Sequence, residues 1–74
     1  MSLATMVDSS VEAQLLEQAH VLRQRADSLR TQAATLPSIL AATYRRRASE
    51  LELESFVIEL QAGIPYDQVQ MPAA

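Results

Sequence analysis

The sequence contains no cysteine and a single histidine, His20. A disulfide framework is therefore excluded, and one histidine cannot build a structural zinc site, which takes about four nitrogen or sulfur ligands. We expect neither a metal nor a cofactor. A chain of 74 residues seldom buries enough surface to fold without disulfides, a metal or association with another chain. Self-association or a partner protein is therefore the expected source of the missing burial.

Glycine occurs once, as Gly63, and few of the apolar residues are aromatic. A chain rich in alanine and leucine and almost free of glycine lacks the turns of all-β folds and favours helices. Its longest apolar run, Ile39 to Ala42, is far below the roughly 20 residues of a transmembrane helix. No basic, apolar leader opens the sequence, because the first basic residue is Arg23. We therefore expect an all-α, cytoplasmic protein that does not contact a membrane.

Two heptad patterns mark the positions that we expect to face a neighbouring helix. In each half of the chain, one of the two heptad positions holds large residues and the other holds small ones, and we call these two positions the seam. This is typical of closely packed helices, because small side chains let the backbones approach. The large seam residues are Leu15, Leu22, Leu29 and Leu36 in the first half and Tyr44, Leu51 and Ile58 in the second. The small ones are Ala19, Ala26 and Ala33, followed by Ala41, Ala48, Ser55 and Ala62.

Pro37 divides these two patterns, and the register of the large residues slips by one position across it. Proline clashes with the preceding helical turn and disfavours helical dihedrals in the residue before it. We therefore predict an antiparallel two-helix hairpin, with a helix at about 10–36, a tight turn at Pro37 and a helix at about 38–62. Gly63 is the expected stop of the second helix. The alternative is one long helix that is kinked at Pro37.

The ends of the chain are predicted to lie outside the hairpin. Ser9 and Glu12 have the spacing of a capping box, which indicates the start of the first helix. We expect 1–8 to be a flexible lead-in, 9–64 to be the helical hairpin and 65–74 to be a flexible tail.

The second helix carries more apolar residues than its seam accounts for. They centre on the side opposite the seam, and such a patch is unusual on the exposed surface of a monomer, so we predict a protein interface there. The alternating LELE segment leaves a β-strand as the alternative. The residues of the predicted interface are Leu53, Phe56, Val57, Leu60 and Ile64.

The basic residues are all arginine and lie between Arg23 and Arg47, where Asp27 is the only acidic residue. A hairpin would place this basic segment near its turn and the acidic segments at its open end. Two hairpins packed antiparallel would bring unlike charges together and bury the Leu53 surface in a twofold four-helix bundle. The alternative is that arginines contact nucleic-acid phosphates or an acidic partner. The candidates are Arg45, Arg46, Arg23, Arg25 and Arg30.

Catalysis is not indicated by any motif. The sequence has no Ser-His-Asp order, glycine-rich phosphate loop or metal-ligand spacing, and the glutamates at 50, 52, 54 and 59 are expected to be a solvated flank. We expect a non-enzymatic helical protein–protein interaction module, such as an adaptor, small chaperone, regulatory subunit or assembly component. The expected partners are a second copy of the chain and another protein. A dimeric nucleic-acid-binding regulator is the alternative.

Overall fold

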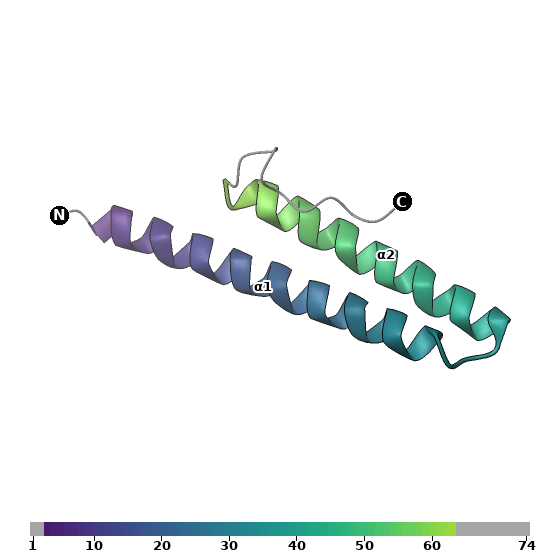
Figure 1. The fold of residues 1–74 in the computed structure, drawn as a ribbon. Coiled ribbons are helices and arrows are strands. Elements are labelled where there is room, and N and C mark those ends of the chain that lie inside the picture. Colours follow the sequence, from purple (N-terminus) through teal and green to yellow (C-terminus); the bar gives the residue numbers. More distant parts are fainter. Residues whose placement is uncertain (1–2, 64–74) are drawn as a thin grey trace.

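Two antiparallel helices form the part of the chain that the structure, a computed structural model, describes: the backbone of residues 3–63 and the side chains of 11–63. Helix α1 spans Leu3–Ala33 and α2 spans Ser38–Gln61. They pack side by side along their length (Figure 1). No strand occurs within residues 3–63. The predicted hairpin is therefore confirmed, and the kinked single helix and the LELE strand are wrong.

The turn between the helices forms as the sequence predicts, although α1 ends at Ala33 and not at about residue 36. Beyond Ala33 the backbone tightens, with the Leu36 N–H donating to the Ala33 carbonyl at 3.2 Å. Pro37 has φ −55° and ψ 151° and caps α2, its carbonyl accepting from the Ala41 N–H at 2.9 Å. The earlier end follows from the proline, because its ring keeps Leu36 out of the helical region.

Helix α1 begins at Leu3, earlier than the predicted start near residue 10. Ser9 and Glu12 therefore lie inside the helix, and the capping-box prediction is wrong. The reason is local, because leucine, alanine and methionine among residues 3–6 are strong helix formers that extend the helix upstream. The flexibility predicted for 1–8 stays a prediction. Ile64 and the predicted tail, 65–74, lie outside the described residues.

Helix α2 ends at Gln61, and the stop predicted at Gly63 is confirmed. The Ala62 N–H donates to the Ile58 carbonyl at 2.9 Å and the Gly63 N–H to the Leu60 carbonyl at 3.1 Å. Gly63 has φ +86°, a left-handed conformation that only glycine adopts without strain from a Cβ atom.

A line of small side chains forms the contact between the helices. The buried small residues are those of the predicted seam: Ala19, Ala26, Ala33, Ala41, Ala48, Ser55 and Ala62. Among the described side chains, Leu51 is the only large one that is buried, at 4% exposed, and Ser55 is the largest with no exposed surface. The other large seam residues are half-buried. The small half of the seam thus lies between the helices, whereas most of the large half remains partly exposed.

The hairpin is one helix thick. Its extents are 56 × 20 × 12 Å, and the smallest of these matches the roughly 10–12 Å diameter of a single helix with its side chains. Domains ordinarily bury their apolar surfaces between two packed layers. Within residues 3–63, the two helices form one layer with two broad faces and no second layer to cover either of them.

Candidate protein-interaction surface

Ion pairs between the helices cover one broad face of the hairpin, which we call the ion-pair face. Arg23 pairs with Glu59, its Nε donating to Glu59 Oε1 at 2.8 Å, and Arg30 pairs with Glu52. All four side chains are partly buried, with the glutamates 14% and 16% exposed. These glutamates are therefore not part of a solvated flank, as the sequence suggested. They connect the two helices.

Ser55 joins this arrangement to the buried line. Its hydroxyl donates to the carbonyl of Ala19 at 3.0 Å and lies 3.4 Å from Glu59 Oε1. This serine occupies a small seam position, where its size admits the close approach of the backbones. The contact also sets the register, with Ser55 opposite Ala19 and, one heptad on, Ala48 opposite Ala26 in the same buried cluster.

Half-buried apolar side chains line the opposite broad face, which we call the leucine face. It consists of Leu22, Leu29 and Ile58, which are half-buried, together with Leu51, which is buried beside them. On α1, Leu22 lies four residues before Ala26 and Leu29 lies three residues after it. The arginines of the ion-pair face have the reverse spacing, three residues before Ala26 and four after it. Helical geometry therefore puts the leucines and the arginines on opposite sides of the alanine. Leu22 and Leu29 pack against the buried cluster of Ala26, Ala48 and Leu51.

Two shallow grooves between the helices run along the leucine face. One is lined by Leu22, Val21 and Ile58 together with Glu17, Gln18 and Arg25. The other is lined by Leu29 and Leu51 together with Arg25, Ser28, Gln32 and Arg47. Because both include Arg25, they are neighbours along the hairpin. The face is thus an apolar strip with arginines toward the turn and glutamates toward the open end.

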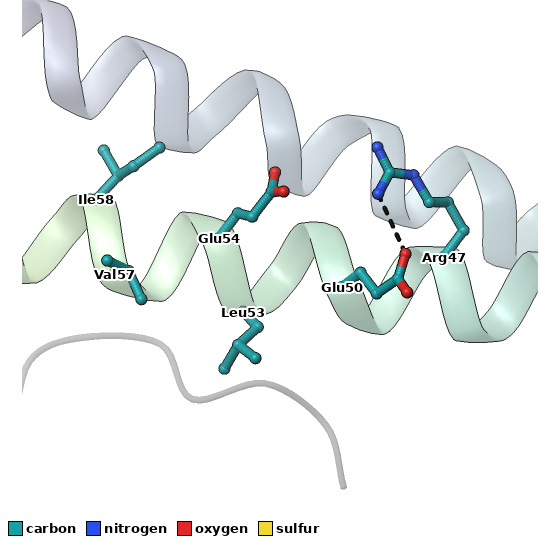
Figure 2. A pocket seen from close by; sticks show the side chains of 6 residues that line it. All are labelled: Arg47, Glu50, Leu53, Glu54, Val57 and Ile58. Atoms are coloured by element: carbon teal, nitrogen blue, oxygen red, sulfur yellow. Dashed lines mark hydrogen bonds and ion pairs between the residues drawn. The ribbon is translucent and has the colours of Figure 1, made fainter.

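A third shallow hollow continues from this face onto the side of α2 that points away from α1. It is lined by Arg47, Glu50, Leu53, Glu54, Val57 and Ile58 (Figure 2). Figure 2 shows Leu53 directed away from α1, whereas Arg47 and Glu54 lie on the side toward it. Arg47 and Glu50 form an exposed ion pair at 3.1 Å.

The outward side of α2 presents much of the interface that the sequence predicts. We call Leu53, Val57 and Leu60 the outer edge of α2; they are 55%, 46% and 38% exposed. Phe56 is half-buried, and Ile64 lies outside the described residues. The structure therefore brings three of the five predicted residues together on an exposed surface. Their role as an interface stays a prediction.

The five candidate arginines are distributed over several surfaces. Arg23 and Arg30 lie in the ion-pair face. Arg25 lines both grooves of the leucine face. Arg45 and Arg46 are exposed on α2. The structure does not gather the five guanidinium groups into one basic patch.

Sequence reasoning missed the leucine face, because it placed both seam positions between the helices. The signal was present in the heptads. At each level along the hairpin, each helix contributes one large and one small seam residue. Two helices packed side by side can place only one of these two positions fully between them.

Among residues 3–63 no group of three or more histidine, cysteine or acidic side chains is placed to hold a metal ion. Neither described helix is long and apolar enough to cross a membrane. A comparison of the chain with protein-family models, curated proteins and solved structures found no match. The function has therefore to be inferred from the surfaces described above.

Proposed function

We propose that the protein is a small, non-enzymatic helical protein–protein interaction module, such as an adaptor, small chaperone, regulatory subunit or assembly component. It dimerises into an antiparallel, twofold four-helix bundle and offers the outer edge of α2 to a second protein. The observation that carries this proposal is the size of the buried interior. Among the described side chains, the largest that is fully buried is a serine, Ser55, while Leu53, Val57 and Leu60 remain exposed.

The energetics of the single hairpin support association. Full burial of a leucine contributes about 1.5–3 kcal/mol, whereas fixing the backbone costs about 1–2 kcal/mol per residue. Within the described hairpin, alanines and Leu51 supply most of the buried apolar residues. Covering the half-buried leucines with another chain adds the apolar burial that one layer lacks.

The outer edge of α2 has the geometry of a helix that binds in a groove. Leu53, Val57 and Leu60 follow one another at i, i+4 and i+7, so they form a row along one side of the helix. Apolar anchors at this spacing are the recognition elements of helix-in-groove complexes. The expected partner is therefore a protein with an apolar groove.

Nucleic-acid binding by the arginines is the weaker alternative. Arg23 and Arg30 pair with glutamates of the same chain, so a phosphate would have to displace a carboxylate at each. Arg45 and Arg46 remain as exposed neighbours on α2. Arg25 is also exposed but lies on the leucine face, so the exposed candidates are divided between two surfaces and do not form the larger set of phosphate contacts found in nucleic-acid-binding proteins.

Site-specific crosslinking tests the partner surface. We expect a photoreactive amino acid at position 57 to form one discrete heteromeric adduct in the native host, identified by mass spectrometry. The adduct should disappear when Leu53→Glu and Leu60→Glu are introduced. The same probe at exposed Gln24, on the outward side of α1, is the control and should not form it. An adduct that survives both glutamates, or that forms equally from position 24, contradicts the proposed surface.

A further inference from the structure

We infer that the second copy in this dimer packs on the leucine face, with its helices antiparallel to the first and the twofold axis near Leu22 and Leu51. The inference rests on the proposed self-association and specifies its interface. It differs from the interface that the sequence suggests, because it leaves the outer edge of α2 free for another protein.

The register of the hairpin gives the height of each charge on this face. Because Ser55 lies opposite Ala19, a residue of α1 and a residue of α2 lie at the same height when their numbers add up to about 74. Leu22 and Leu51 are then level. With a rise of about 1.5 Å per residue, Arg25 lies about 4 Å and Arg47 about 7 Å from them toward the turn.

Two acidic residues that border the face lie on the other side of this centre, whereas a third, Glu50, lies about 2 Å from it toward the turn and pairs with Arg47 within α2. By the same register, Glu54 lies about 4 Å and Glu17 about 8 Å from the Leu22–Leu51 level toward the open end. All four charged side chains are exposed, and each lines a groove or hollow that borders the leucine face. Arg25 and Arg47 on one side and Glu54 and Glu17 on the other therefore lie at similar distances from one point.

An antiparallel twofold dimer makes use of this arrangement. When the two leucine faces meet with their turns at opposite ends, each helix lies over its own counterpart. Arg25 then approaches the partner's Glu17, and Arg47 approaches the partner's Glu54. Twofold symmetry repeats both contacts, so four unlike pairs surround the apolar strip, with the charges at its rim.

The parallel arrangement of the same two faces is disfavoured by the same charges. With the turns at one end, α1 of one copy lies over α2 of the other at the same height. Arg25 then meets the partner's Arg47, and Glu17 meets the partner's Glu54. Glu50, which already pairs with Arg47 of its own chain, adds one unlike contact near the partner's Arg25, but the like contacts outnumber it and disfavour this orientation.

The two other surfaces are less suited to the second copy. A dimer through the ion-pair face would bury ion pairs that are already complete in each hairpin. Their removal from water costs desolvation energy, and no new pairs form in return. The outer edge of α2 is a single row on one helix. The leucine face, by contrast, draws its apolar side chains from both helices.

Charge reversal tests the interface without removing an apolar side chain. One variant carries Arg25→Glu and Arg47→Glu, and the other carries Glu17→Arg and Glu54→Arg. We expect each variant alone to dimerise on the order of 10- to 100-fold more weakly than the wild type, because four unlike contacts become like ones. An equimolar mixture should recover the wild-type affinity as a heterodimer. Sedimentation velocity and native mass spectrometry measure both results, and circular dichroism verifies that each variant is folded.

The combination Leu53→Glu with Leu60→Glu is the matched control, and it should leave the dimer intact. If both charge variants dimerise alone as tightly as the wild type, the leucine face is not the interface. If only the control variant dissociates, the second copy sits on the outer edge of α2, which overturns this inference and leaves the proposed interaction module standing. A wild-type chain that is a folded monomer at high micromolar concentration overturns the proposed dimer itself.

Discussion

The ion-pair face and the leucine face lie on opposite sides of the same line of alanines. They differ in whether a single chain satisfies the side chains that they carry. On the ion-pair face, Arg23 and Arg30 each reach a glutamate on the other helix. On the leucine face, the described residues form no ion pair between the helices, and Leu22, Leu29 and Ile58 stay half-buried. The first face is suited to water as it stands. The leucine face has the composition of one of the two surfaces that meet in a protein interface.

The largest effect is expected at the alanine line that both faces share. Ala48 is 0% exposed, so Ala48→Leu would force the helices apart and disturb both faces at once. Overpacking of this kind typically costs about 1–3 kcal/mol, and we expect the upper end because two backbones meet here. Urea unfolding followed by circular dichroism measures the loss. Ala42→Leu, at an exposed position of the same helix, should change stability little, and an equal loss in both variants would contradict the close contact.

The next largest effect is expected on the leucine face. Leu22→Ala removes a half-buried side chain that packs against the core cluster, and in the dimer it also removes contact with the second copy. We expect the wild-type melting temperature to rise with protein concentration, as it does for an associating protein. The rise should be smaller in Leu22→Ala.

Leu53→Ala is the matched control for that experiment, because it removes the same side chain from the outer edge of α2. Its melting temperature should keep the wild-type dependence on concentration. A melting temperature of the wild type that does not change with concentration would remove the distinction between the two faces.

The ion-pair face should respond in stability but not in association. A double-mutant cycle of Arg23→Met and Glu59→Gln is expected to give a coupling of about 0.5–1 kcal/mol, at the upper end of measured exposed pairs because both partners are partly buried. Added salt should reduce the coupling. The dimer dissociation constant should stay unchanged in all three variants, as measured by analytical ultracentrifugation. A weaker dimer in the cycle would place this face in the interface.

The smallest effect is expected at the exposed arginines. Arg45→Ala with Arg46→Ala should leave the fold and the dimer as in the wild type, and neither protein should bind duplex DNA or RNA in fluorescence anisotropy at low salt. Binding that falls steeply with salt and weakens in the double variant would favour the nucleic-acid alternative.

Local rules of sequence were sufficient for the turn and for the end of α2, but not for the bounds of α1. Pro37 and Gly63 predict the turn and the stop, because each limits the backbone dihedrals of its own neighbourhood. The start of α1 was missed because a capping signal at Ser9 has little weight against good helix formers on both sides of it. The exposed row of Leu53, Val57 and Leu60 follows from helical spacing alone.

The sequence by itself determined two helices, their antiparallel return and the line of small residues between them, because heptad spacing and proline act locally. The tertiary structure alone decided which half of the seam goes inside. That choice depends on the distance and rotation between the helices, which the volumes of side chains on both helices set together. The same distance brings Arg23 to Glu59, 36 residues apart in sequence, and leaves the leucines on the opposite face only half covered.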